Sequence, residues 1–137
     1  MKVHDVDVAI LGAGTAGLGA FKAASKYTDR ILLIDGGPLG TTCARVGCMP
    51  SKLLIAAAEA AHQSRHSEIF GVVNSRTTID GKAVMARVQR ERDRFVSFVL
   101  KSIDGIPDAR KIYAFGEFLG DHRLQLSNGD KVDAKAV

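Results

Sequence analysis

The chain has 137 residues, of which 46% are hydrophobic and 25% charged, proportions typical of a folded globular domain. The longest run without a charged side chain, residues 8–21, is too short and too rich in glycine for a membrane span, and the acidic N-terminus is unlike a secretory signal. The net charge of +4 is a modest excess that gives no reason to expect a nucleic-acid partner.

The first 35 residues carry the pattern of a β-α-β unit. Residues 6–11 form a short apolar run that ends at glycine, which predicts a buried strand. The alanine-rich residues 14–27 predict a helix, and residues 31–34 predict a second strand that ends at Asp35. This order indicates an α/β fold with a parallel sheet.

Two helices are predicted in the middle of the chain, over residues 51–63 and 82–104. In the second one, apolar residues recur at spacings of four and seven and therefore share one helix face. These apolar residues are Val84, Val88, Phe95, Val99 and Ile103.

The last third of the chain reads as strands. Residues 111–119 and 123–126 are predicted strands, and Asn128–Gly129 predicts a tight hairpin turn in which both central residues adopt positive φ. Residues 134–137 read as the start of a further strand, so we expect residues 1–137 to form an incomplete domain.

Residues 12–17 match the phosphate-binding pattern G-x-G-x-x-G. Gly12 would allow the tight turn, Gly14 the approach of a pyrophosphate, and Gly17 the close packing of helix on strand. Asp35 follows Gly17 by 18 residues, where its carboxylate can accept hydrogen bonds from ribose hydroxyls. FAD and NAD share the adenosine diphosphate that this pattern recognises, so it does not choose between them.

Cys43 and Cys48 are five residues apart, which leaves three interpretations. The first is a reactive redox pair, which requires a distortion at Gly47 and Pro50, because five residues of regular helix turn the two side chains away from each other. A helix start nearby would favour the thiolate. The pair is also compatible with a reducing compartment, and we expect a cytoplasmic location.

The second interpretation is a metal site with His62 and His66. It is disfavoured, because His62 would lie about 16 Å along the predicted helix from its start, far beyond a metal–ligand bond. We therefore expect no metal. The third interpretation is a pair of inert reduced cysteines.

The cysteine segment resembles the flavin-dependent pyridine nucleotide–disulfide oxidoreductases, and most closely the dihydrolipoamide dehydrogenases among them. That family carries G-G-T-C-x-N-V-G-C-x-P-[SK]-K, and the resemblance extends over essentially the whole chain. The chain departs from the family pattern at Thr41, where glycine is usual, and at Arg45, where asparagine is usual. The matching residues are Gly40, Thr42, Cys43, Val46, Gly47, Cys48, Pro50, Ser51 and Lys52.

The resemblance implies a Rossmann-like FAD-binding domain, a parallel sheet with flanking helices and a small antiparallel hairpin layer. Cys43 would exchange electrons with the substrate sulfur, Cys48 would face the flavin, and Lys52 would lie near the flavin ring as a catalytic residue. The residues that would line FAD are Gly12, Gly14, Thr15, Ala16, Gly17, Asp35, Gly36, Thr42, Lys52 and Gly116.

The implied activity moves electrons between a dithiol and NAD through a Cys43–Cys48 disulfide and FAD. The substrate would be a small dithiol or a lipoyl domain, and the complete enzyme would be a homodimer with no nucleic-acid or membrane partner. We expect the NAD-binding and dimerisation domains to lie outside residues 1–137, and these residues alone to be inactive with NAD. A mercuric reductase-like enzyme and a non-catalytic flavin-binding module remain alternatives.

Overall fold

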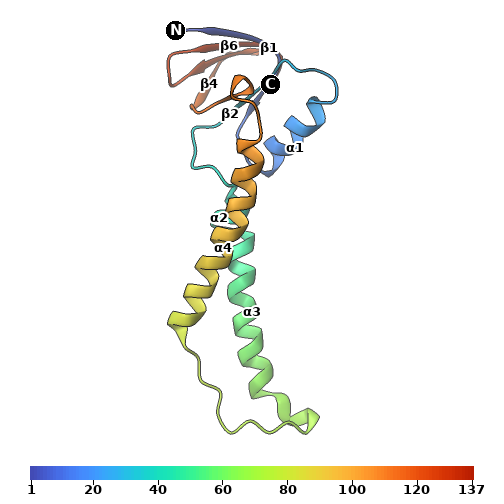
Figure 1. Cartoon of the computed structure of the whole chain (residues 1–137), viewed down its shortest axis with the longest axis vertical. Helices are drawn as coiled ribbons and strands as arrows, with labels where there is room; N and C mark the ends of the chain where they lie inside the picture. The colour runs from blue at the N-terminus through green and yellow to red at the C-terminus, as the bar shows by residue number, and fades with distance from the viewer. The chain divides into compact units, whose positions relative to one another are not determined.

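The computed structural model describes residues 1–137, and Figure 1 follows them along the chain. They group into two compact units. The sheet unit contains residues Met1–Thr41 and Val99–Val137, and the helical unit contains Thr42–Phe98. No helix in the chain is both apolar enough and long enough to cross a lipid bilayer.

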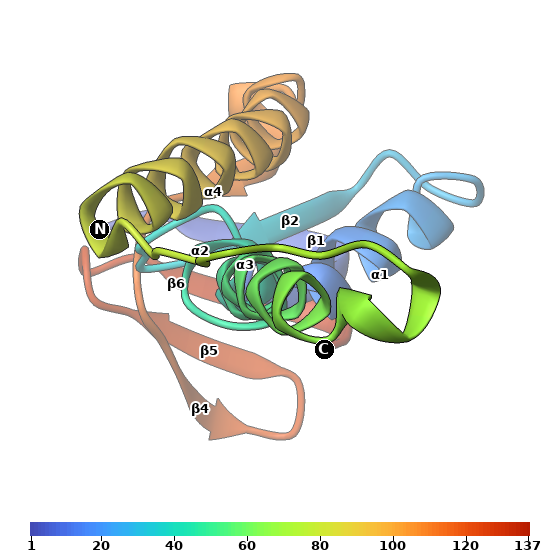
Figure 2. The same ribbon diagram turned by 90° about the horizontal axis from the view of Figure 1, so that it is seen from below.

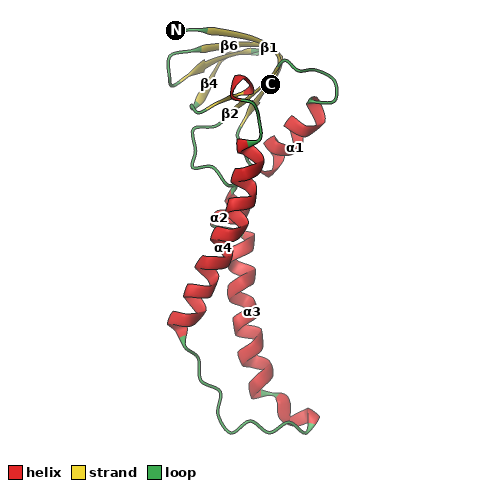
Figure 3. Cartoon of the chain, in the orientation of Figure 1, coloured by secondary structure: helices red, strands yellow, loops and turns green.

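The sheet unit is built on six strands in the order β3-β2-β1-β6-β5-β4. Figure 3 colours the strands of this sheet yellow. β1 runs parallel to β2 and β6, and β2 runs parallel to β3, whereas β5 is antiparallel to both β6 and β4. Figure 2 shows β4 and β5 beyond β6. The strands are β1 (Val3–Leu11), β2 (Ile31–Ile34), β3 (Lys111–Ile112), β4 (Gly116–Gly120), β5 (Arg123–Leu126) and β6 (Lys131–Ala136).

The sheet confirms the predicted mixed α/β architecture. Its parallel centre is connected by helix α1 (Thr15–Ala24), which follows β1 directly. β1 begins at Val3 rather than at the predicted Val6, because its first residues pair with β6, from Val3 opposite Lys131 onward. The antiparallel strands continue the same six-stranded sheet.

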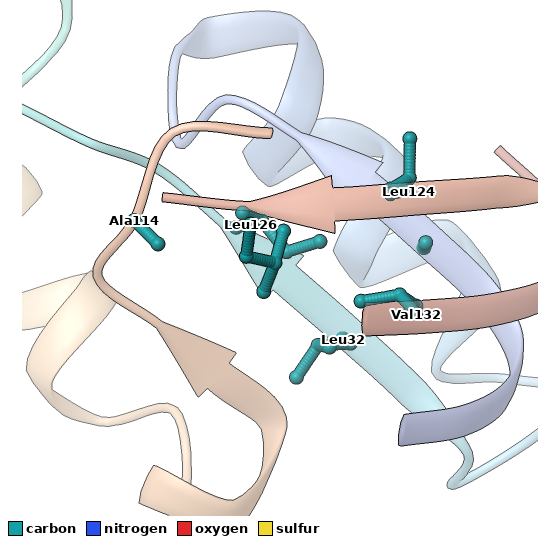
Figure 4. Packing of buried hydrophobic residues seen from close by; sticks show 7 residues of the cluster. Leu32, Ala114, Leu124, Leu126 and Val132 are labelled. Atoms are coloured by element: carbon teal, nitrogen blue, oxygen red, sulfur yellow. The ribbon is translucent and has the colours of Figure 1, made fainter. Parts of the chain in front are cut away.

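Apolar side chains cover both faces of the sheet, because successive residues of a strand point to opposite sides. Ala9 and Leu32 belong to one cluster, and their neighbours Ile10 and Leu33 belong to the other. The other buried members of the first cluster, shown in Figure 4, are Ile34, Ala114, Leu124, Leu126 and Val132. The second cluster is completed by Ala13, Ile31, Ile103 and Ile106.

The strand predicted over residues 111–119 is wrong as one element. The structure divides it into β3, after the 3-10 helix η2 (Asp108–Arg110), and β4, and these two strands form opposite edges of the sheet. The backbone between them pairs elsewhere: Ala114 donates to the carbonyl of Asp35 at 3.1 Å, and Phe115 accepts from the N–H of Ser127 at 2.8 Å. These partners are distant in sequence, so local periodicity could not indicate the break.

The hairpin predicted at Asn128–Gly129 is present between β5 and β6, but its turn type is different. Only Gly129 has positive φ, at 90°. The Leu126 N–H donates to the Asp130 carbonyl at 2.8 Å, and the side-chain oxygen of Asn128 accepts from the Asp130 N–H at 3.0 Å. The side chain of Asn128 thus stabilises a longer turn than the two-residue one expected.

The helical unit contains α2 (Thr42–Arg45), α3 (Cys48–Arg65), the 3-10 helix η1 (Ser67–Phe70) and most of α4 (Gly81–Asp104). α3 and α4 run in opposite directions (Figures 1 and 2). Asp80 directly precedes α4 and acts as its N-cap, with its carboxylate accepting the Ala83 N–H at 3.0 Å. The predicted apolar stripe of α4 is confirmed, since its members are all buried or half-buried.

Candidate functional site

The glycine turn between β1 and α1 has the geometry that the sequence pattern predicts. Gly12 has φ of 99°, a conformation that favours glycine, and its N–H donates to the Ile34 carbonyl at 2.7 Å. A Cβ atom on Gly17 would lie 1.8 Å from the carbonyl oxygen of Gly12. Helix α1 therefore approaches β1 as closely as it does only because residue 17 has no side chain.

The first turn of α1 is open to an anion. Gly14 is the N-cap residue, no side chain caps the helix, and no acidic residue lies in its first turn. The exposed residues Thr15 and Ala16 begin the helix. Uncapped N–H groups at a helix start attract negative charge, so this turn suits a pyrophosphate.

Asp35 ties the glycine turn to the loop after β2. One carboxylate oxygen accepts the Ala13 N–H at 2.5 Å, and the other accepts the Gly37 N–H at 2.6 Å. A carboxylate oxygen has more than one lone pair, so both oxygens can still accept hydrogen bonds from ribose hydroxyls. The residues present here fit the adenosine part of FAD.

A cavity of about 210 Å³ lies beside this turn, within the sheet unit. It brings together four of the residues that the sequence predicted at the cofactor. Its lining consists of Leu11, Gly12, Ile34, Asp35, Gly36, Ala114, Phe115 and Gly116.

Phe115 is a lining residue that sequence reasoning missed. Its ring packs directly on Gly36, where an added Cβ would lie 2.5 Å from ring carbons. The neighbouring Gly116 was predicted, and a Cβ there would lie 2.7 Å from the side chain of Leu11. Phe115 directly precedes the predicted Gly116 in the sequence, and this adjacency was the available signal, but the contact with Gly36 depends on the tertiary fold.

The two cysteines lie in the helical unit, on either side of a helix break. Cys43 belongs to α2, and Cys48 is the first residue of α3. The expected distortion occurs at Gly47, whose φ and ψ of −118° and −115° lie outside the helical region. Pro50 does not contribute to the break, contrary to prediction, because it lies in the first turn of α3, where proline is tolerated.

Cys43 and Cys48 are both free cysteines. The pKa of Cys43 is raised, mainly through hydrogen bonding to the Cys48 side chain, and then by burial and the charge of Cys48. The positive charge of Lys52 acts in the opposite direction and lowers the pKa of Cys43. The backbone N–H of Cys48, at the start of α3, also lowers the pKa of Cys43, so the helix start acts in the predicted direction but is outweighed by the causes that raise the pKa. Cys48 and Lys52, which were predicted together with Cys43, both influence its ionisation.

The segment before the cysteines explains one departure from the family pattern. Thr41 has φ of 61°, the left-handed conformation that glycine adopts without strain. Thr42, predicted at the cofactor, begins α2, and its carbonyl accepts the Val46 N–H at 3.0 Å. His62 on α3 and His66, the residue that follows α3, are both exposed, and their rings stack with centroids 4.1 Å apart.

Comparison with known proteins supports the family resemblance that the cysteine segment indicates. A sequence model described as pyridine nucleotide-disulphide oxidoreductase matches residues 6–134. A dihydrolipoyl dehydrogenase of Geobacillus stearothermophilus is 30% identical over 129 residues, covering 92% of this chain and 27% of that protein. A mercuric reductase of Shigella flexneri is 33% identical over 126 residues, covering 89% of this chain and 22% of that protein.

One solved structure shows the same fold. It is the Cu(II) complex of a HOCl-induced flavoprotein disulfide reductase from Escherichia coli, with a TM-score of 0.67 and 20% identity. The alignment covers 93% of this chain and 26% of that one. The chain thus spans about a quarter of the length of the relatives it matches.

Proposed function

Because the chain belongs to the pyridine nucleotide-disulphide oxidoreductase family, an oxidoreductase family, we propose that it binds FAD and carries a redox-active Cys43–Cys48 pair. The protein of which this chain forms part or all would act as a disulfide reductase of the dihydrolipoamide dehydrogenase type. The observation that carries the proposal is the placement of two free cysteines on either side of the helix break at Gly47. A regular helix would turn two side chains five residues apart away from each other, whereas such a break lets them approach for disulfide formation.

In this proposal FAD is held by the glycine turn and Asp35. The N–H groups at the start of α1 would bind the pyrophosphate, and Asp35 would bind the ribose hydroxyls. Gly36 and Gly116 line the adjacent cavity, and Thr42 and Lys52 are the residues of the helical unit assigned to the flavin part.

Electrons would enter through thiol–disulfide exchange. A substrate thiolate attacks the sulfur of Cys43 in the Cys43–Cys48 disulfide, a mixed disulfide forms, and Cys48 leaves as a thiolate. The second substrate thiolate then attacks the substrate sulfur of the mixed disulfide and releases Cys43. The substrate thereby loses two electrons and two protons, and the cysteine pair gains the two electrons.

Bound FAD supplies the two-electron chemistry that reoxidises the pair, with NAD as the final acceptor in the dihydrolipoamide dehydrogenase type of reaction. Lys52 contributes a positive charge beside Cys43, which stabilises the thiolate left after exchange. The raised pKa of Cys43 means that its thiolate forms less readily while Cys48 remains reduced beside it.

The test is dithiol-driven flavin reduction. The chain is loaded with FAD and mixed anaerobically with dihydrolipoamide, and the visible flavin absorption is followed. We expect rapid bleaching in the wild-type chain and loss of this rapid phase in Cys48→Ser, with FAD still bound. Equal bleaching rates in both would contradict a redox role for the pair and favour a non-catalytic flavin-binding module.

The mercuric reductase type is the second candidate, supported by the similarity to the Shigella flexneri enzyme. Two adjacent thiolates bind soft metal ions well. An FAD-loaded, reduced chain whose flavin is reoxidised by Hg(II) but not by lipoamide would favour this candidate.

A further inference from the structure

The cavity beside the glycine turn combines one carboxylate with an apolar lining, and both lie within the sheet unit. Asp35 is its only ionisable residue. An apolar cavity of about 150 Å³ can hold benzene, so the volume of about 210 Å³ here gives room for a larger flat ring. The other lining residues with side chains are all hydrocarbon: Leu11, Ile34, Ala114 and Phe115.

One face of the Phe115 ring is covered by Gly36, and the other face is open. A Cβ atom built on Gly36 would lie 2.5 Å from each of three consecutive ring carbons, Cγ, Cδ1 and Cε1. A point equally far from three atoms of a planar ring lies on the axis through its centre, so Gly36 sits over the ring face. Phe115 is nevertheless 65% exposed, which leaves the opposite face free for a ligand.

The absence of a side chain at residue 36 is explained by this ring. Gly36 is not among the glycines with positive φ, so its backbone conformation does not require glycine. Any side chain at this position would occupy the space of the Phe115 ring. The contact between backbone and ring is therefore a specific feature of the cavity wall.

The backbone of Phe115 is held in place by Ser127. The Phe115 N–H donates to the hydroxyl oxygen of Ser127 at 3.0 Å, and the Phe115 carbonyl accepts the Ser127 N–H at 2.8 Å. The preceding N–H, that of Ala114, donates to the Asp35 carbonyl at 3.1 Å. The ring therefore belongs to a segment that is fixed before a ligand arrives, which reduces the entropy cost of binding.

The chemistry of the lining selects a neutral, flat group attached to a ribose. No basic side chain lines the cavity, so it offers a phosphate no opposite charge. Asp35 is the residue proposed to bind the ribose hydroxyls, and it lines the same cavity as Phe115. A base attached to that ribose can therefore reach the open face of the ring.

We propose that Phe115 is the base-stacking residue of the cofactor site, with the adenine of FAD lying in this cavity against the open face of the ring. This inference rests on the proposed FAD binding and adds to it a side chain that determines affinity for the adenine part. Aromatic side chains stack on nucleobases through the flat faces of both rings.

The test separates the adenosine part of the cofactor from its pyrophosphate. FAD bound to the chain is displaced by ADP or by inorganic pyrophosphate, and the displacement is followed by flavin fluorescence polarisation. Both competitors present a pyrophosphate, but only ADP carries the base. The dissociation constants are measured for the wild type, Phe115→Leu, Phe115→Tyr and Tyr113→Leu.

Tyr113→Leu is the matched control, because Tyr113 is an aromatic residue of the same segment that is 68% exposed but does not line this cavity. We expect Phe115→Leu to raise the dissociation constant of ADP about twofold to tenfold, because leucine has no flat face. Phe115→Tyr keeps the ring and should keep the wild-type affinity. Tyr113→Leu should leave ADP binding unchanged, and no variant should alter pyrophosphate binding.

Unchanged ADP binding in Phe115→Leu, equal weakening in Tyr113→Leu, or equal weakening of pyrophosphate would overturn this inference and leave FAD binding intact. If Phe115→Leu does not fold, the wild-type chain decides: nuclear Overhauser effects between adenine protons of bound ADP and the Phe115 ring support stacking, and their absence contradicts it. A wild-type chain that binds no FAD contradicts the proposed function itself.

Discussion

Gly17 and Gly19 lie two residues apart in α1, yet their surroundings are opposite. A Cβ on Gly17 would collide with the Gly12 carbonyl oxygen, whereas a Cβ on Gly19 would meet no atom within 4 Å. We predict that Gly17→Ala lowers the free energy of unfolding by about 1–3 kcal/mol through overpacking. Gly19→Ala should raise it by about 0.5–1 kcal/mol, because alanine is the better helix former.

Urea denaturation of both variants measures the difference directly. Gly19→Ala is the control, because it makes the same chemical change in the same helix. Equal effects on unfolding from the two substitutions would show that α1 does not approach the glycine turn as closely as described.

The charge of Lys52 is one of several influences on the ionisation of Cys43, and it favours the thiolate. Since Lys52 lowers the pKa of Cys43, we predict that Lys52→Met raises that pKa further. Alkylation of Cys43 by iodoacetamide, followed by peptide mass spectrometry, should then require a higher pH. Cys48→Ala should shift the pH dependence of Cys43 alkylation to lower pH, because it removes the largest cause of the raised pKa of Cys43.

Lys82→Met, at the exposed start of α4, is the control for loss of a lysine charge. If the pH dependence of Cys43 alkylation is the same in Lys52→Met and Lys82→Met, the electrostatic role assigned to Lys52 is contradicted.

At Thr41, the sequence shows the departure from the family pattern but does not show the backbone conformation. The departure from the usual glycine was visible in the sequence, but only the structure gives its φ of 61°. The left-handed conformation costs a non-glycine residue roughly 1–2 kcal/mol, so the backbone geometry is retained at the expense of strain. The tight turn at Gly12 and the close packing at Gly17, by contrast, follow from local geometry that the motif itself encodes.

Among the elements, Asp130 in the β5–β6 turn forms contacts with two residues at the start of β1. One oxygen accepts the Lys2 N–H at 2.7 Å, and the other lies 3.2 Å from Nε2 of His4. The backbone hydrogen bond from Lys2, followed by the His4 contact, lowers the pKa of Asp130 below its ordinary value of 3.8. The folded state therefore favours the ionised carboxylate.

A lowered pKa in the folded state stabilises the fold above the ordinary aspartate value, and this contribution is lost as the pH falls through the folded value. We predict that Asp130→Asn lowers the melting temperature at neutral pH. The difference from wild type should shrink as the pH falls below 3.8.

Asp121→Asn, in the exposed β4–β5 turn, is the control for loss of an aspartate charge in a neighbouring turn. If the two variants melt alike from neutral to acid pH, Asp130 does not fasten β1 in the way described.

Elements with a strong local signal could be predicted, and elements defined by distant partners could not. β2 and β5 match the predicted 31–34 and 123–126, because short apolar runs bounded by turns define them. α4 begins one residue before its predicted start, since its apolar stripe is long. The start of β1 was not predicted correctly, because it is fixed by pairing with β6. The break between β3 and β4 was not predicted, because it depends on hydrogen bonds to Asp35 and Ser127.

At the scale of the whole molecule, the two chemical motifs belong to two different units. The glycine turn and Asp35 lie in the sheet unit, and the cysteine pair with Lys52 lies in the helical unit. Each set was predictable, because each is contiguous or nearly contiguous in sequence. A cavity in the helical unit that is lined by Arg45 and Arg92 was not predictable, because these two residues are 47 positions apart in the sequence.

The central claim is that residues 1–137 bind FAD through the glycine turn, and the most direct test is flavin retention. The purified chain is mixed with FAD, passed over a desalting column, and examined by visible absorption together with circular dichroism. We predict that the wild-type chain retains close to one FAD per chain and that Gly19→Ala does the same. A folded wild-type chain that emerges without flavin would contradict the account.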